Sequence, residues 1–173
     1  MTKNLDNEGF RSIVENYDIF YIDLWGVIHN GITLHKHAIE TLVEISKAKK
    51  KYVLLTNAPR PNSTVKNFLE KMGMNEMIRE KVYSSGEASL EYLKKNHLSE
   101  MFYHIGPPRD FDLFREFEKN KEQNINQSSY LLCTGLFEDY GEDLNHYKKL
   151  FKDHLDKKMI CTNPDLIVDR GDK

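Results

Sequence analysis

Short apolar runs recur along the chain, and each leads into polar residues and a turn-forming Gly, Asn or Pro. The runs are three or four residues long and do not alternate with polar positions. Continuous apolar runs of this kind are typical of parallel strands that are covered on both faces. We therefore predict strands at residues 19–22, 52–55, 101–103, 130–133 and 159–161.

Apolar positions at helical spacing lie between these runs. They predict helices within 38–45, 65–72 and 144–151, and the weaker patterns at 87–93 and 111–117 predict two more. Asn62 or Ser63 is a candidate N-cap for the second helix, and Gly73 is its expected end. Alternating strands and helices favour an α/β fold with a parallel sheet.

The composition argues against several classes of protein, including nucleic-acid-binding, membrane-spanning and secreted proteins. The 173 residues carry a net charge of −2, which gives no electrostatic reason to expect nucleic acid or an anionic membrane as a partner. No apolar run approaches the ~18 residues of a membrane span, and the first residues lack the apolar core of a secretory signal. Cys133 and Cys161 lie far apart, so we expect buried packing thiols, no disulfide or zinc framework, and a cytoplasmic protein.

Polar residues directly after two of the apolar runs are candidates for chemistry. Asp23 follows the first run, and Thr56 and Asn57 follow the second. Ligand sites in open parallel sheets lie beyond the carboxyl ends of the strands. If the two strands are neighbours, a carboxylate faces hydrogen-bond donors, which suits phosphoryl transfer. The alternative is that Asp23 and Thr56 only cap the loop backbone.

Four short segments resemble one known family. Residues 20–31 (FYIDLWGVIHNG) and 54–57 (LLTN) are similar to the first two motifs of the haloacid dehalogenase superfamily. Together with 84–87 (SSGE) and 161–165 (CTNPD), they resemble its class IIA branch, the NagD-like phosphatases. This resemblance implies a Rossmannoid parallel sheet with an inserted α/β cap domain. The expected boundaries are 1–83 for the first half of the core, 84–162 for the cap, and 163–173 for the return to the core.

The resemblance also implies a reaction. Asp23 is expected to attack a small phosphorylated metabolite and to form an aspartyl-phosphate that water hydrolyses. Mg²⁺ is expected on the Asp23 carboxylate and on the backbone carbonyl of Trp25, with Thr56 and Asn57 binding the phosphate. A carboxylate attacks a phosphate dianion only when a cation and oriented donors neutralise the charge.

Two departures from the family pattern support an alternative. Trp25 occupies the position of the family's second aspartate, the general acid and base, and His29 is a candidate substitute. The family's later lysine and acidic cluster follow the cap, so we expect a C-terminally truncated chain with an incomplete core, inactive on its own. The alternative is an impaired relative that binds a phospho-ligand or a protein partner; a homodimer formed through exposed sheet edges is a third hypothesis.

Three further residues are candidates near the substrate. Arg60 follows Thr56 closely and could meet an anionic group or simply be exposed. Asn163 and Asp165 lie in the segment expected to return from the cap, although an Asn-Pro-Asp turn explains them almost as well.

Overall fold

The computed structural model describes residue 5 and residues 9–141 and 143–165, and these divide into two compact units. The first unit contains residues 5, 9–56 and 68–82, and the second contains 57–67, 83–141 and 143–165. The expected boundaries at 83/84 and 162/163 stay predictions, and residues 166–173 of the expected return to the core lie outside the described residues.

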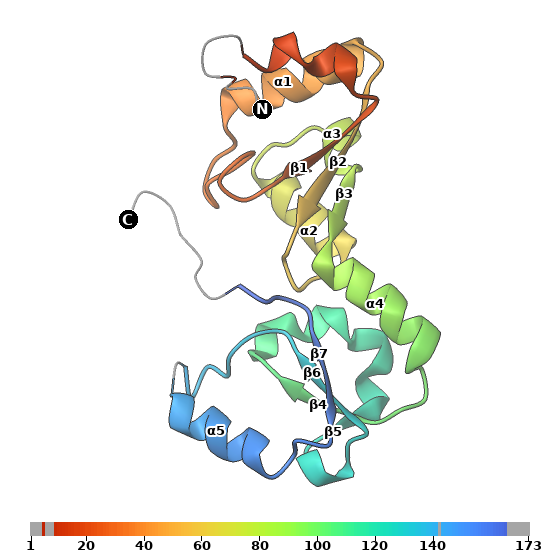
Figure 1. The fold of residues 1–173 in the computed structure, drawn as a ribbon, viewed down its shortest axis with the longest axis vertical. Coiled ribbons are helices and arrows are strands. Elements are labelled where there is room, and N and C mark those ends of the chain that lie inside the picture. Colours follow the sequence, from red (N-terminus) through yellow and green to blue (C-terminus); the bar gives the residue numbers. More distant parts are fainter. Residues whose placement is uncertain (1–4, 6–8, 142, 166–173) are drawn as a thin grey trace. The chain divides into compact units, whose positions relative to one another are not determined.

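The first unit is built on a three-stranded β-sheet (Figure 1). Strands β1 (Ile19–Asp23), β2 (Lys51–Thr56) and β3 (Val82–Ser84) lie in that order, and β1 and β2 are parallel. The last two residues of β3 belong to the second unit. Helix α1 (Lys36–Lys47) connects β1 to β2. The other helical elements are η1 (Phe10–Ser12), η2 (Val14–Asn16), α3 (Glu76–Arg79) and α2 (Asn62–Lys71), whose first residues belong to the second unit.

The core of the first unit follows from the apolar pattern. Leu54 on β2 is fully buried, and the apolar stripe of α1 contributes Leu42 and Ile45. Burial of each large aliphatic side chain contributes about 1.5–3 kcal/mol relative to exposure. The remaining buried apolar residues of this unit are Leu24, Ile28, Tyr52, Leu69, Met74, Ile78 and Val82.

Strand β1 is less covered than the sequence predicts. It lies at one edge of the sheet, and alternate residues on it, Ile19 and Tyr21, are 41% and 67% exposed. Leu55 on β2, the register partner of Asp23, is also exposed. The expectation that both faces are buried is therefore wrong for β1, whose residues are alternately exposed and half-buried.

The second unit contains a separate parallel sheet. Its strands β4 (Phe102–Ile105), β5 (Lys121–Glu122), β6 (Tyr130–Cys133) and β7 (Lys158–Cys161) lie in the order β5-β4-β6-β7. Helices α4 (Ser85–Asn96) and α5 (Leu144–Lys152) and the 3₁₀ segments η3 (Pro108–Leu113), η4 (Arg115–Asn120) and η5 (Ile125–Gln127) complete it. The structure therefore confirms the expected parallel-sheet α/β class.

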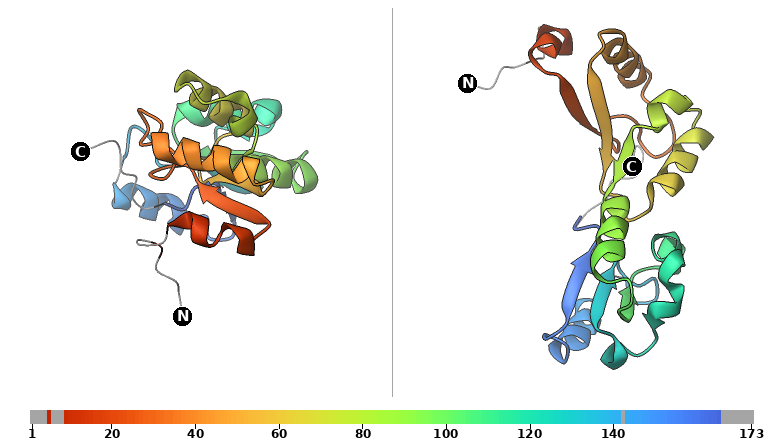
Figure 2. Two further views of the ribbon diagram at one scale, coloured as in Figure 1. Left: turned by 90° about the horizontal axis from the view of Figure 1, so that it is seen from above. Right: turned by 90° about the vertical axis from the view of Figure 1, so that its right-hand side faces the viewer.

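In this second sheet, β6 is covered on both faces, as its apolar run predicts (Figure 2). The same prediction is wrong for the edge strand β7, on which Met159 and Cys161 are exposed. On one face, Tyr130 and Leu132 of β6 pack with residues of α4, η3 and η4. On the other face, Leu131 of the same strand packs with Tyr147 of α5. Successive strand residues point to opposite faces, so a strand that is apolar throughout serves both cores.

The segment predicted as a helix at 111–117 is not an α-helix. It is divided between η3 and η4, and Phe114 between them has φ −119° and ψ 15°. Phe111, Phe114 and Phe117 are spaced by three residues, and a 3₁₀ helix with three residues per turn places such residues on one face. All three rings pack in the core on that side of the sheet.

The ends of α2 also refine the predictions. Gly73 follows the helix with φ 84°, and the next amide, from Met74, donates to the Leu69 carbonyl, as expected for a glycine-terminated helix. The two predicted N-cap residues, Asn62 and Ser63, instead lie inside the helix. None of the helices in the described part of the chain is both long and apolar enough to cross a bilayer.

Candidate active site

Asp23 and Thr56 are the last residues of two neighbouring parallel strands. Asp23 pairs in register with Leu55, so Thr56 comes directly after the partner of Asp23. Because adjacent strands lie about 4.8 Å apart, both residues are at the same corner of the sheet. Asp23 is exposed and Thr56 is half-buried. The two residues that the sequence predicts to act together therefore lie at the ends of neighbouring strands in the first unit.

The backbone after β1 orients the Asp23 carboxylate. The Leu24 amide donates to Asp23 Oδ1 at 2.8 Å and also lies 3.0 Å from the Leu55 carbonyl oxygen. A hydrogen bond from an amide to a carboxylate is charge-assisted and stronger than a neutral one. This contact holds one carboxylate oxygen against the turn, at the end of a strand that is itself paired.

The loop after Asp23 folds tightly on itself. The Leu24 carbonyl accepts hydrogen bonds from the amides of Ile28 and His29 at 2.8 and 3.1 Å. Gly31 adopts φ 89°, and a Cβ atom built there would lie 2.6 Å from the Trp25 ring. Both the backbone conformation and the close ring require glycine at this position. The Trp25 indole therefore packs the loop, at the position where the family carries a carboxylate.

His29 is placed by the same loop and is 3% exposed. Its Nδ1 accepts a hydrogen bond from the Gly31 amide at 3.0 Å, and its ring contacts the edges of Trp25 and Phe68. Burial and then the nearby His35 lower the pKa of His29, against an opposing effect of Asp23. The imidazole is thus held neutral near pH 7, which favours a packing role over proton donation.

In the second unit, the loop after Thr56 is fastened to the start of α4. Ser84 Oγ donates to the Arg60 carbonyl at 2.6 Å, and the Gly86 amide donates to the Ala58 carbonyl at 3.0 Å. A Cβ atom at Gly86 would lie only 2.2–2.4 Å from backbone atoms of Arg60. Glycine is therefore required at position 86 because two backbone segments touch there.

Side chains complete this attachment. Asn62 Oδ1 accepts from the Ser84 amide at 2.9 Å, and Glu87 Oε2 accepts from the Asn62 amide at 2.7 Å. Ser84 Oγ also caps α4 by accepting from the Glu87 amide at 3.0 Å. Residues 84–87, which form part of the family resemblance, thus have a structural role: they hold the 57–62 loop in place.

Asn57 and Asp165, both predicted site residues in the second unit, are brought together. Asn57 Nδ2 donates to Asp165 Oδ2. Asn163 Oδ1 accepts from the Asp165 amide at 3.0 Å, which is the local turn that the sequence offered as the alternative. Ser85 Oγ donates to the Thr162 carbonyl at 2.5 Å, so the chain after β7 is also tied to the start of α4.

Arg60 contacts the first member of a series of buried, hydrogen-bonded polar side chains that the sequence analysis did not identify. Its Nη2 lies 3.5 Å from Oδ1 of Asp110, which is 4% exposed. Burial raises the pKa of Asp110, while a hydrogen bond with Thr134 and the Arg60 charge oppose this rise. Thr134 Oγ1 in turn lies 2.8 Å from His104 Nε2. His104 is in β4 and Thr134 directly follows β6, so the rule that selected Asp23 and Thr56 also applies to these two residues.

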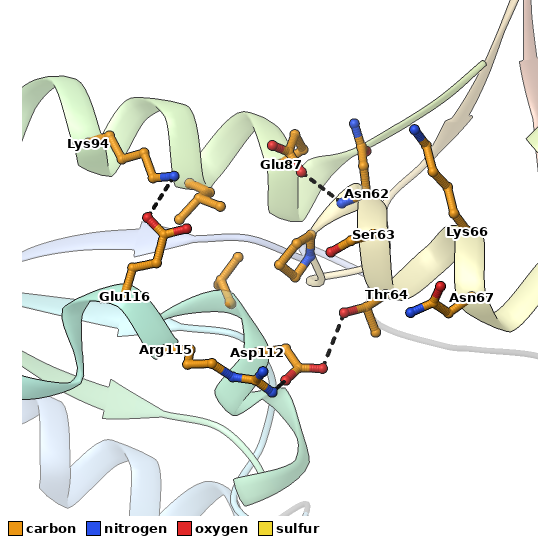
Figure 3. Close-up of a pocket in the computed structure, with 13 residues that line it drawn as sticks. Asn62, Ser63, Thr64, Lys66, Asn67, Glu87, Lys94, Asp112, Arg115 and Glu116 are labelled. Atoms are coloured by element: carbon orange, nitrogen blue, oxygen red, sulfur yellow. Dashed lines mark hydrogen bonds and ion pairs between the residues drawn. The ribbon is translucent and has the colours of Figure 1, made fainter. Parts of the chain in front are cut away.

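The second unit also contains a polar pocket of about 660 Å³ beside α2 and α4 (Figure 3). Its charged groups are mostly paired with one another. Lys94 and Glu116 form an ion pair at 2.8 Å, Arg115 binds Asp112, and Thr64 donates to Asp112 at 3.2 Å. None of the predicted site residues is among the described residues that line the pocket. The pairing leaves no excess charge of either sign to select an ionic ligand.

Mg²⁺ is the ion that the expected chemistry needs, and the donor types at the end of β1 suit it. Mg²⁺ is commonly held by one or two carboxylates together with water and substrate phosphate oxygens. The exposed Asp23 carboxylate supplies one such ligand. The described residues contain no group of three or more His, Cys, Asp or Glu side chains that could hold a metal by themselves.

Known proteins resemble this chain in sequence. The family model of haloacid dehalogenase-like hydrolases matches residues 20–119. Phosphoglycolate phosphatase 2 of Arabidopsis thaliana is 25% identical over 190 residues, which covers 94% of this chain and 61% of the relative. The chain thus spans about three fifths of the length of this relative.

Solved structures resemble it in fold. A haloacid dehalogenase-like hydrolase from Brucella suis 1330 has a TM-score of 0.80 and 26% identity, covering all of this chain and 64% of that one. NagD from E. coli K-12 has a TM-score of 0.61 and 22% identity, covering 89% and 59%, a likeness of fold alone. With its family motifs at the ends of adjacent parallel strands, this chain belongs to the haloacid dehalogenase-like hydrolases.

Proposed function

We propose that the full-length protein is a Mg²⁺-dependent phosphatase of small phosphorylated metabolites that works through an aspartyl-phosphate on Asp23. The observation that carries this proposal is the register of β1 and β2, which brings Asp23 and Thr56 to one corner of the sheet. The names of the relatives agree with it, because they include a phosphoglycolate phosphatase and a 4-nitrophenylphosphatase.

In this proposal Asp23 attacks the phosphorus atom and the ester oxygen leaves. Thr56 and the backbone at Asn57 donate hydrogen bonds to the phosphoryl oxygens, and water then hydrolyses the acyl phosphate. Mg²⁺, held by the Asp23 carboxylate and the Trp25 carbonyl, would neutralise the phosphate charge. Arg60, Asn163 and Asp165 remain candidates for contacts with the substrate. We assign residues 84–162 to a cap domain that selects the substrate.

The test is hydrolysis of p-nitrophenyl phosphate by the full-length protein with Mg²⁺. Asp23→Asn is expected to abolish turnover because an amide neither attacks phosphorus nor binds the cation well. Asp18→Asn is the matched control: the same chemical change at the exposed residue just before the other end of β1, where turnover should be retained. Equal turnover by the wild type and Asp23→Asn would refute the proposal.

A second candidate function is an impaired relative that binds a phospho-ligand or a protein partner without turnover. Trp25 favours it, because the indole is packed against Gly31 and can neither donate nor accept the proton that the family's second aspartate handles. Calorimetry with inorganic phosphate and Mg²⁺ should then show binding while p-nitrophenyl phosphate is left intact. Sustained release of p-nitrophenol would exclude this candidate.

A further inference from the structure

Cys133 and Cys161 are register partners at the carboxyl ends of the adjacent parallel strands β6 and β7. The strand spacing of about 4.8 Å lies within the Cα separations that disulfides bridge. Both thiols are free, and each donates to a backbone carbonyl two residues further along the chain: Cys133 to Gly135 at 3.6 Å and Cys161 to Asn163 at 3.3 Å. The expectation that both are buried packing thiols is wrong, because Cys161 is exposed and Cys133 is only half-buried.

The two thiols have different environments. Cys161 lies on β7, an edge strand, whereas Cys133 lies on β6, between β4 and β7. Burial, together with the neighbouring Cys161, raises the pKa of Cys133 to about 11. An exposed thiol beside a more protected one is the arrangement in which the first reacts with an oxidant and the second resolves the product.

We propose that Cys133 and Cys161 form a reversible intramolecular disulfide when the protein meets a small-molecule disulfide such as glutathione disulfide. The Cys161 thiolate attacks one sulfur of that oxidant, whose S–S bond breaks and releases one thiolate, which takes a proton from water. Cys133 gives its proton to water, as Cys161 does before its own attack. Cys133 then attacks the Cys161 sulfur and expels the second thiolate, which also takes a proton from water. Two protein thiols are oxidised by two electrons, and the oxidant is reduced to two thiols.

The position of the pair gives the disulfide a structural effect. The Thr162 amide, next to Cys161, donates to the Cys133 carbonyl at 2.9 Å, and the Thr162 carbonyl accepts from Ser85 Oγ at 2.5 Å. The bond would therefore fix the end of β7 to β6 at the point where the chain contacts α4. Exposed disulfides are readily reduced, so the bond should open with dithiothreitol.

The test is intact-mass analysis and non-reducing peptide mapping of the folded full-length protein after treatment with glutathione disulfide. The wild type should lose two hydrogen atoms, join the peptides of Cys133 and Cys161, and regain its mass in dithiothreitol. Cys133→Ser should keep one glutathione on Cys161, because the resolving thiol is missing. Cys161→Ser should react at least tenfold more slowly than the wild type, since the half-buried thiol alone remains.

Three outcomes would overturn the proposal. One is a wild type that retains glutathione on Cys161 as stably as Cys133→Ser does. Another is a disulfide between two chains in place of the internal bond. The third is no reaction while far-UV circular dichroism shows that the protein is folded. The Cys→Ser variants should give the wild-type spectrum, because serine is nearly isosteric with cysteine.

Discussion

Asp23 and Leu55 face each other across the parallel strands β1 and β2, one residue before Thr56. A shift of this register by one residue would exchange the faces on which the side chains of β1 lie. The buried Leu54 and the exposed Leu55 show that β2 has distinct faces, so the register is well specified. The position of Asp23 at the end of β1, beside the end of β2, is therefore set by core packing rather than by the site itself.

Replacing Gly86 with alanine should destabilise the protein although position 86 is helical. Alanine normally stabilises a helix interior by about 1 kcal/mol relative to glycine. Here the added Cβ atom would overlap backbone atoms of Arg60 at 2.2–2.4 Å, so we expect a loss of about 3 kcal/mol in the free energy of unfolding. Urea denaturation of the two proteins measures this difference.

Gly135→Ala is the matched control for this overlap. The nearest atom to a Cβ there is Pro107 Cδ at 3.4 Å, an ordinary contact. The free energy of unfolding should change by no more than about 0.5 kcal/mol. A Gly86 variant as stable as this control would contradict the close packing of the 57–62 loop on α4.

His104 should make the protein sensitive to mild acid. Burial lowers the pKa of His104 to about 4, below its ordinary value of 6.5. As the pH falls from 6.5 to 5, the unfolded chain binds a proton that the folded chain does not, so stability decreases by up to about 2 kcal/mol. His104→Gln, whose amide can still donate to Thr134, should flatten this dependence in urea titrations at each pH.

His37→Gln is the control, because the His37 side chain is 95% exposed. The loss of stability below pH 6.5 should persist in this variant, because His104 is unchanged. Two charged groups also affect this measurement. Lys121 adds to the lowering of the pKa of His104. Asp110 has a raised pKa, so its carboxyl group adds stability as the pH falls. Restricting the measurement to pH 6.5–5 limits the contribution of Asp110. An unchanged slope in His104→Gln would contradict the buried neutral imidazole.

The packed Trp25 predicts a preference among phosphate esters. Without a carboxylate at position 25, the protein has no general acid there to protonate a poor leaving group, a deficiency that typically costs ~10²–10⁴ in rate. p-Nitrophenyl phosphate, whose leaving group departs as a stable anion, should therefore be hydrolysed much faster than an alkyl phosphate such as glycerol phosphate. Comparable kcat values for the two esters would show that another residue donates the proton.

Much of the fold was predictable because local apolar patterns produce it. The runs that predicted strands at 19–22, 52–55, 101–103, 130–133 and 159–161 correspond to β1, β2, β4, β6 and β7. Strands β3 and β5 were missed because they are only three and two residues long. Residues 120–129 contain β5 and η5, and the polar residues of this segment show no periodic apolar pattern from which either element could be predicted.

The candidate site was less predictable, because it depends on contacts between distant residues. The motifs identified Asp23 and Thr56 individually, whereas their neighbourhood depends on the β1–β2 register, which a single sequence does not reveal. The chain from Arg60 through Asp110 and Thr134 to His104 joins residues up to 74 positions apart. His104 and Thr134 satisfy the strand-end rule, and Arg60 is a candidate by its place after Thr56, but nothing in the sequence joins them to Asp110. Only burial makes their pairing necessary.

The most direct test of the account is to find the phosphoryl group on the protein. Full-length protein with Mg²⁺ and ³²P-labelled phosphate ester is quenched in acid during turnover and digested. We expect hydroxylamine-labile label on the peptide that contains Asp23, and none in Asp23→Asn. Steady turnover with no label on that peptide, or with label on a different residue, would contradict nucleophilic attack by Asp23.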